Sequence, residues 1–238
     1  MIDFSDTGDI DVFIDEKQIT KLEERMQTKG FLEGHVMASA FNSLRARDLI
    51  WSFFIKNYLE GKAPAPFDIL YWNADSTNMP ALMHSQYLRW MYLHNDLIKP
   101  GKIQILGTAL DVSQIDIPTF FVSTQKDHIA PWKTTYKGFQ YMNGEKHFIL
   151  GGSGHIAGII IPPGTEKYGY YQNKTCATTP DDWLTNATFH PGSWWPEWLE
   201  WLKEKSGALI NAPNAVTLPF QAMMTAPGSY IHLDGKLV

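Results

Sequence analysis

The sequence predicts an α/β protein built around a parallel sheet. Two short runs, residues 117–124 (IPTFFVST) and 146–152 (KHFILGG), are rich in β-branched and aromatic residues. Their nearly continuous apolar character is typical of strands that are buried on both faces. Residues 130–144 (APWKTTYKGFQYMNG) lie between them and have the length of a helix. The order strand, helix, strand indicates two neighbouring parallel strands joined by a helix.

A first helix is predicted near the N-terminus, over residues 15–29. Asp15 is a suitable N-cap, Gln18 occupies the capping-box position, and Gly30 ends the run. The predicted apolar stripe of this helix consists of Ile19, Leu22 and Met26.

Two more helices are predicted before residue 100. Residues 41–61 carry apolar side chains at helical spacing until Gly61. Residues 62–80 form a proline-rich loop around a short strand-like run. Pro80 favours the first turn of a third helix, which continues over residues 81–95.

The character of the sequence changes near residue 100. Residues 102–115 alternate in polarity and turn at Gly107, which predicts a pair of small strands. Residues 193–207 predict a late helix, whose expected apolar face consists of Trp195, Trp198, Leu199 and Leu202. We therefore predict a mostly helical module over residues 1–100 and a sheet-bearing core over residues 101–238.

Composition narrows the class of protein. The formal net charge is −5 and no basic run is present, which disfavours nucleic acid as a partner. A single cysteine leaves no disulfide framework and fits a reducing compartment. We find neither a signal-peptide pattern nor 18 successive apolar residues, so we expect a cytoplasmic protein without a transmembrane segment. The aromatic content of 13% fits a large core, or an apolar surface for a lipid-like ligand, polymer or partner.

Asp127 and His155 each follow a predicted strand by a few residues. Reactive groups collect at the carboxyl ends of parallel strands, so the two side chains are expected to meet there. An acid on one strand and a histidine after the next is the second half of the nucleophile–Asp–His order of α/β-hydrolases. In that chemistry the imidazole takes the proton of the nucleophile and the carboxylate orients the imidazole.

Other roles stay open for these residues when each is taken alone. An aspartate after a strand often caps a turn or helix, and a histidine after glycines is often structural. His128 can position its loop or contact substrate. A zinc site formed by Asp127, His128 and His155 is conceivable. Adjacent Asp and His side chains rarely converge on one ion, however, so we predict no metal.

The nucleophile is missing from the pattern. An elbow of the form Gly-x-Ser/Cys-x-Gly is expected upstream of the acid. The only upstream glycines at that spacing, Gly30 and Gly34, have Leu32 between them. Ser153 and Cys176 both follow the acid in the chain, which argues against either as the nucleophile.

At these residues the chain resembles a known family, the class I polyhydroxyalkanoate synthases. The segments that resemble its C-terminal part are DHIAPW, GGSGHIAG, FDILYWNADSTNMP and KYGYYQN. The segments that resemble its cap subdomain are DFSDTGDIDVFIDE and NSLRARDLIWSFF. The resemblance covers essentially the whole chain, and several motifs agree in order and interval.

The resemblance implies an α/β-hydrolase-like fold with a mostly helical cap. It also implies an acyltransferase that polymerises (R)-3-hydroxyacyl-CoA, with 3-hydroxybutyryl-CoA as the expected substrate, and releases CoA by Cys-His-Asp chemistry. Coenzyme A is part of the substrate, and no cofactor is expected. His155 resembles the general base, and Asp127 resembles the residue that orients it or activates the 3-hydroxyl group. His128, Trp72 and Arg45 lie in family motifs near the active site or cap, as candidates for substrate binding or lining.

The resemblance also implies that the family's cysteine elbow precedes this chain. We therefore expect the chain to be a C-terminal portion, inactive alone and poorly soluble because its sheet lacks neighbouring strands. Expected partners are the growing polyester, the granule surface and a second copy bound through the cap. Alternatives are an esterase or depolymerase fragment, or a non-catalytic fragment that binds granules or an intact synthase.

Overall fold

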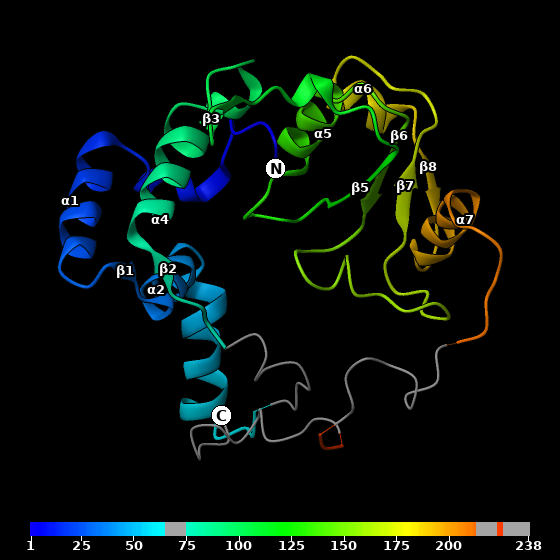
Figure 1. The fold of residues 1–238 in the computed structure, drawn as a ribbon. Coiled ribbons are helices and arrows are strands. Elements are labelled where there is room, and N and C mark those ends of the chain that lie inside the picture. The colour runs from blue at the N-terminus through cyan, green and yellow to red at the C-terminus, as the bar shows by residue number, and fades with distance from the viewer. Residues whose placement is uncertain (65–74, 213–222, 226–238) are drawn as a thin grey trace. The chain divides into compact units, whose positions relative to one another are not determined.

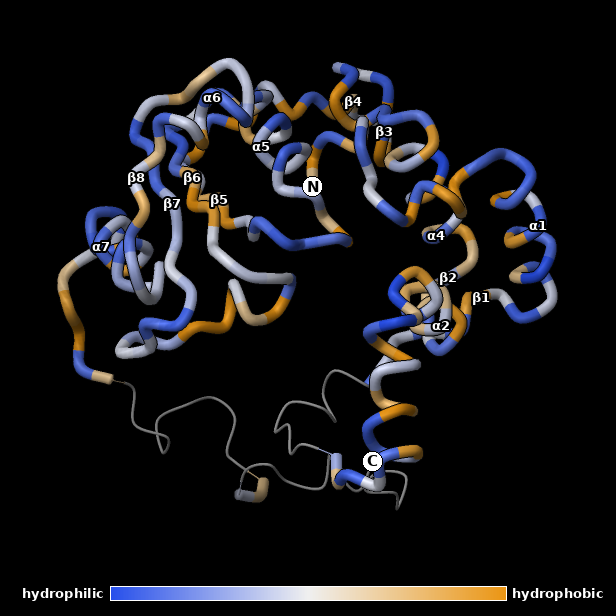
Figure 2. The backbone as a smooth tube through the Cα atoms, turned by 180° about the vertical axis from the view of Figure 1, so that it is seen from behind, coloured by the Kyte–Doolittle hydropathy of each residue, from blue (hydrophilic) through white to orange (hydrophobic). Residues whose placement is uncertain are grey.

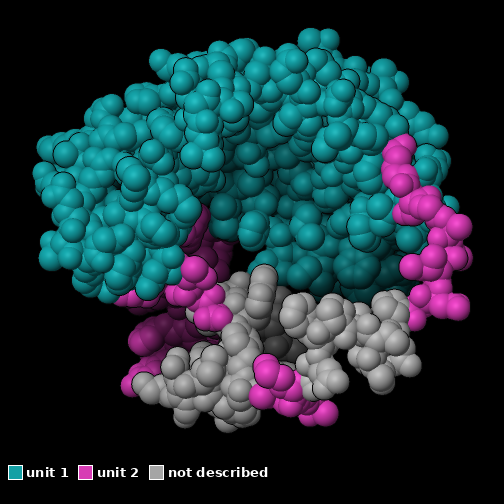
Figure 3. Space-filling model, viewed as in Figure 1, with its two compact units in different colours: residues 1–33, 78–204 teal, residues 34–77, 205–238 magenta. Residues whose placement is uncertain are grey.

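The computed structural model describes residues 1–64, 75–212 and 223–225. They form two compact units, shown in different colours in Figure 3. Unit 1 contains residues 1–33 and 78–204, and unit 2 is drawn from residues 34–77 and 205–238. The boundary predicted near residue 100 falls inside unit 1, and the division into cap and core stays a prediction.

Unit 1 contains a four-stranded mixed sheet, with its strands side by side in the order β5-β6-β7-β8 (Figure 1). The strands are β5 (Thr119–Thr124), β6 (Lys146–Gly151), β7 (Tyr170–Gln172) and β8 (Thr188–His190). The predicted strand–helix–strand unit is confirmed, because β5 pairs with β6 in parallel and α5 (Trp132–Tyr141) connects them. β7 and β8 are antiparallel additions, so the sheet is not parallel throughout. Each has only three residues, too few for a clear alternating pattern.

One face of the sheet packs against α5 and α6 (Pro180–Thr185). The parallel register places Phe121 beside Phe148, and both rings contact Phe139 of α5. Phe148 also packs edge-on against Trp183 of α6, at 5.0 Å between ring centroids. The buried cluster on this face consists of Trp132, Tyr136, Phe139, Phe148, Leu150 and Trp183. Figure 2 shows the hydrophobic colour along β6 that accompanies this burial.

The opposite face of the sheet packs against α7 (Trp195–Lys205) and the residue before it. Because side chains alternate along a strand, Phe120 points away from α5 and its ring lies 5.4 Å from Trp201 and 6.3 Å from Trp194. Trp198 and Leu199, which were predicted to face the core, are 41% and 47% exposed. The α7 helix is therefore confirmed, but its packing face is rotated from the predicted one.

The elements outside the sheet are short. The helices are α1 (Glu16–Gln27), α2 (Gly34–Leu44) and α4 (Ala81–Tyr87), with π-helical turns at Arg47–Trp51, Phe54–Leu59 and Leu88–Leu93. Short 3₁₀ segments cover Gly8–Phe13, Asp96–Ile98 and Val112–Gln114. Two-residue strands pair as β1 (Phe31–Leu32) with β2 (Met79–Pro80), and β3 (Gln104–Ile105) with β4 (Thr108–Ala109).

Most of the predicted helices and turns are confirmed. Gly107 has a φ of 79° between β3 and β4, as the predicted turn requires. The helical run predicted over residues 41–61 begins earlier, at Gly34, and continues through the π-helical turns to Leu59. Its apolar residues are largely exposed in unit 2, for example Phe53 at 57%. None of the helices in the described parts of the chain combines the length and the apolar character that a membrane crossing requires.

The first helix has the predicted cap. The carboxylate of Asp15 accepts hydrogen bonds from the backbone N–H of Gln18 at 2.8 Å and from its Nε2 at 2.7 Å. Ile19 and Met26 are buried, whereas Leu22 of the predicted stripe is only partly so. In Figure 2, hydrophobic and hydrophilic residues alternate along α1, as expected for a helix with one packed face.

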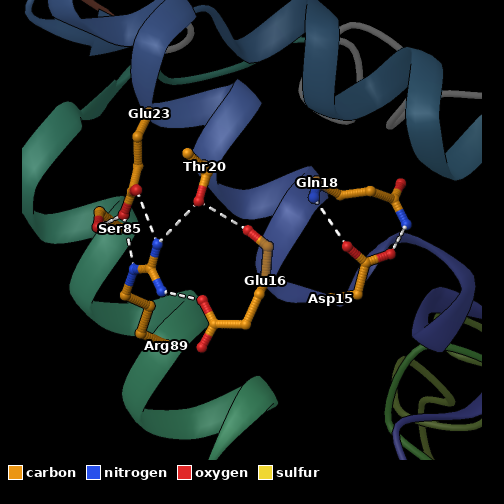
Figure 4. Close-up of polar contacts among 7 residues, drawn as sticks. All are labelled: Asp15, Glu16, Gln18, Thr20, Glu23, Ser85 and Arg89. Carbon is orange, nitrogen blue, oxygen red and sulfur yellow. Dashed lines mark hydrogen bonds and ion pairs between the residues drawn. The ribbon is translucent and has the colours of Figure 1, made fainter.

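A polar network holds α1 against α4 and the turn after it (Figure 4). Arg89 Nε and Nη2 each donate to the carboxylate of Glu23 at 2.8 Å, and Nη1 donates to Glu16 Oε2 at 2.6 Å. Ser85 also donates to Glu23. Hydrogen bonds from Arg89 and then Ser85 lower the pKa of Glu23 to about 2. A forked guanidinium suits this two-point contact with one carboxylate.

We expect the change Arg89→Met to lower the free energy of unfolding by about 1–2 kcal/mol, because Glu23 loses its charged partner. Denaturant titration measures this, with Lys29→Met at the exposed Lys29–Glu33 pair as the matched control. The control should cost about 0.5 kcal/mol or less. Since the pKa of Glu23 is depressed, the contribution of Arg89 should persist above pH 4.5 and disappear as the pH falls towards 2. Equal losses in the two variants at neutral pH would contradict the assignment.

Candidate active site

The side chains of Asp127 and His155 meet at the carboxyl ends of β5 and β6. His155 Nδ1 lies 2.9 Å from Asp127 Oδ2, across 28 residues of sequence. Asp127 follows the last residue of β5 by three positions, and His155 follows the last residue of β6 by four. Because β5 and β6 are parallel, both loops leave the sheet at the same end, where the two strands finish. The convergence predicted from their spacing is therefore observed.

The position of Asp127 is fixed by its own loop. Asp127 Oδ1 accepts backbone hydrogen bonds from Ile129 at 2.9 Å and from Ala130 at 3.0 Å. The side chain is 11% exposed, so little of the carboxylate is left to water. Asp127 does stabilise a local turn, as an aspartate after a strand often does. That turn uses only one of the two carboxylate oxygens. The second oxygen is directed to His155.

Backbone hydrogen bonds join the loop before His155 to the loop of Asp127. Lys126 N donates to Ser153 O at 2.9 Å, and Gln125 N donates to Gly151 O at 2.9 Å. The residue with positive φ in this loop is Ser153, at 78°, and not one of the glycines beside it. A non-glycine residue rarely adopts that conformation, so the surrounding bonds must hold it there.

A close contact explains the glycine at the far end of this loop. A Cβ atom at Gly158 would lie 2.4 Å from Thr124 Cγ2, at the end of β5, and 2.7 Å from Gly152 O. Only glycine lets the chain fold back so tightly on the strand. The GGSGHIAG segment is therefore a compact turn packed on β5, which keeps His155 near Asp127.

The charges of the pair reinforce each other. Burial opposes ionisation of Asp127, but hydrogen bonds from His155, Ala130 and Ile129 outweigh it and lower its pKa. The hydrogen bond to Asp127 raises the pKa of His155, against a smaller effect of burial. Because an ionised carboxylate only accepts hydrogen bonds, Nδ1 of His155 carries a proton in this contact. In the neutral ring, Nε2 then has the lone pair and can act as a base.

Of the three other predicted site residues, the structure describes His128 and Arg45. His128 adjoins Asp127, and its carbonyl oxygen would lie 3.1 Å from a Cβ at Gly8, so this loop packs on the N-terminal segment. Arg45 lies in unit 2, where Nε donates to Asp48 at 3.1 Å. Trp72 lies outside the described residues. Their roles at an active site stay predictions.

Cys176 lies away from the pair. It lines a cavity of about 280 Å³ together with Glu145, His147 and Trp183. His147 is near the start of β6, whereas His155 follows the end of that strand. Among the described residues, no group of three His, Cys, Asp or Glu side chains is arranged to hold a metal ion.

Known proteins resemble this chain over nearly its whole length. No protein-family profile matches the chain. The chain is 46% identical to a poly(3-hydroxyalkanoate) polymerase of Methylorubrum extorquens over 233 residues. The aligned region covers 98% of this chain and 38% of that relative. It is 44% identical to the poly(3-hydroxyalkanoate) polymerase subunit PhaC of Rhizobium meliloti (98% of this chain, 38% of the relative). The corresponding subunit of Cupriavidus necator is 40% identical over 238 residues (97% of this chain, 40% of the relative).

The chain spans about two fifths of the length of these curated relatives. The similarity extends over nearly all of its own residues at 40–46% identity. Over nearly all of its own residues, the chain is therefore homologous to one part of the poly(3-hydroxyalkanoate) polymerases.

Proposed function

We propose that this chain supplies the acid–base pair of a polymerase that transfers (R)-3-hydroxyacyl groups from coenzyme A thioesters to a growing polyester. The observation that carries the proposal is the 2.9 Å contact between Asp127 and His155, in a chain similar over nearly its full length to polymerases. The ring nitrogen of His155 that faces away from Asp127 is the one that a base requires. The imidazole is 49% exposed, so a reacting group can reach it.

The chemistry follows from the tautomer of His155. Nε2 removes the proton of a cysteine thiol supplied from outside these residues, and the thiolate attacks the thioester carbonyl. The tetrahedral intermediate collapses with cleavage of the bond to the CoA sulfur, which leaves as a thiol with the proton from Nε2. A hydroxyl group of the polyester or the incoming unit then attacks the cysteine thioester and loses its proton to the base. The C–S bond to the cysteine breaks, and the departing thiolate takes up that proton. The Asp127 carboxylate stabilises the imidazolium in each step.

The wider architecture belongs to the same proposal. We assign residues 101–238, which include the four-stranded sheet, to the C-terminal part of an α/β-hydrolase-like core, and residues 1–100 to a mostly helical cap. Arg45, Trp72 and His128 are proposed to line the substrate path. Aromatic side chains in the cap would keep water away from the acyl-enzyme, because hydrolysis would end chain growth. We propose a cytoplasmic protein that works at the polyester granule and pairs with a second copy through the cap.

The proposal is tested with the protein as its gene encodes it. Release of free thiol from (R)-3-hydroxybutyryl-CoA should accompany formation of polyester, which is measured by precipitation or gas chromatography. Hydrolysis of simple esters without polymer would indicate an esterase or depolymerase instead. Binding to granules without thiol release would indicate a non-catalytic role.

The change Cys176→Ser should leave the rate of thiol release within about twofold of the unmodified protein. Cys176 lines a cavity with residues at the start of β6, so its thiol is not placed to exchange a proton with His155. The measurement is the same polymerisation assay, with the thermal midpoint as a check on folding. A loss of more than about 100-fold without unfolding would make Cys176 the nucleophile. By the same reasoning, the 238-residue chain alone should form no polymer.

A further inference from the structure

The segment that carries His155 is tied to the start of α7 by two tryptophan side chains. Trp194 Nε1 donates to Gly158 O at 3.2 Å, and Trp195 Nε1 donates to Ile159 O at 3.0 Å. Each bond spans 36 residues of sequence. Two successive carbonyl groups are therefore held by two successive indole groups.

These carbonyl groups are closely linked to His155. Gly158 N donates to Gly154 O at 3.0 Å, and Gly154 directly precedes His155. Ile159 N and Ile160 N both donate to Ile156 O, at 3.0 and 2.9 Å. The two indole groups thus hold a hydrogen-bonded turn that begins at the residue before the histidine.

Trp194 is anchored in turn on the strand that leads to Asp127. Trp194 stacks on Phe120 of β5 at 6.3 Å between ring centroids. The same strand ends three residues before Asp127. The turn of His155 and the carboxylate of Asp127 are therefore both positioned from β5.

We infer that Trp194 and Trp195 are positioning residues, which hold the turn of His155 so that its ring stays within hydrogen-bond reach of Asp127. The inference rests on the proposed role of His155 as the base. The imidazole is half exposed, so packing around the ring alone does not fix it. A displacement of about 1 Å can reduce a catalysed rate by about 100-fold, so the backbone that carries the ring must be held firmly.

The test replaces each tryptophan by phenylalanine, which keeps an aromatic ring and removes the N–H donor. Trp195→Phe and Trp194→Phe should each lower kcat of the full protein by about 10- to 100-fold, with KM nearly unchanged. Trp198→Phe is the matched control on the same helix, because Trp198 is 41% exposed. It should leave kcat unchanged. Wild-type kcat in both Trp194→Phe and Trp195→Phe would overturn the inference.

A second readout does not depend on polymerase activity. In protein labelled with ¹⁵N-histidine, the titration of His155 is followed by NMR, with His155→Ala to assign its signal. The pKa of His155 is raised by the bond to Asp127, so a looser turn should move the titration to lower pH in Trp195→Phe. An unchanged titration in Trp194→Phe and Trp195→Phe would refute the positioning role. If His155→Ala keeps full activity while the titration still moves, the proposed function fails and the positioning role stands.

Hydrogen exchange in the unmodified protein covers the case in which the variants do not fold. The indole N–H groups of Trp194 and Trp195 should exchange much more slowly than that of Trp198, because both are engaged with backbone carbonyls. Equal exchange at all three positions would overturn the inference.

Discussion

Replacing His155 by alanine is expected to lower the rate of thiol release from (R)-3-hydroxybutyryl-CoA by between about 10³- and 10⁶-fold. His155 Nδ1 lies 2.9 Å from the Asp127 carboxylate, so its Nε2 can accept the proton of an incoming nucleophile. Without it, the nucleophile must lose its proton to water. The full protein is assayed by trapping the released thiol with a chromogenic disulfide, and the polymer is quantified in parallel.

Folding must be preserved for this result to be interpreted. The side chain of His155 is 49% exposed, so its removal should change the thermal midpoint little. His94→Ala is a suitable control histidine, since His94 is exposed and lies outside the sheet. Near-normal turnover in a folded His155→Ala protein would show that His155 is not the catalytic base.

The change Asp127→Asn is expected to reduce turnover by about 10⁴-fold, the size of effect known for loss of a triad aspartate. An amide can donate a hydrogen bond to Nδ1, and this stabilises the tautomer in which Nε2 carries the proton and cannot act as a base. The side chain keeps its size, so the backbone bonds from Ile129 and Ala130 retain an oxygen acceptor.

The pH dependence distinguishes this role from a structural one. A general base must be neutral, so the rate should rise with pH through the pKa of His155, which Asp127 raises above its ordinary value of 6.5. In Asp127→Asn, the contact that raises the pKa of His155 is lost. The acidic limb of the pH–rate profile should therefore move to lower pH. A limb at the original position would show that Asp127 does not interact with the base during catalysis.

The resemblance to the polymerases and the local features of the core could be read from the sequence. Apolar runs of strand length around a helix-length segment predicted β5, α5 and β6. The positions of Asp127 and His155 after two such runs predicted their meeting. Asp15 and Gln18 predicted the start of α1. These are short-range signals, because a strand, a helix or a cap is decided by residues within a few positions of one another.

Other features depended on packing between distant segments. The three-residue strand β7 pairs with the edge of β6, and the three-residue strand β8 pairs in turn with β7. Ser153 takes the strained φ beside three glycines, because the neighbouring loops hold its backbone there. The packing side of α7 was decided by Phe120 on the sheet rather than by the period of its own apolar residues.

The sequence by itself therefore determined which residues could carry acid–base chemistry and which strands would present them. Only the tertiary structure decided that Asp127 gives one oxygen to its own loop and the other to His155, and that Trp194 and Trp195 hold the histidine turn. The physical reason is that secondary structure follows from local periodicity, whereas a hydrogen bond across 28 or 36 residues exists only after the sheet and its covering helices have packed.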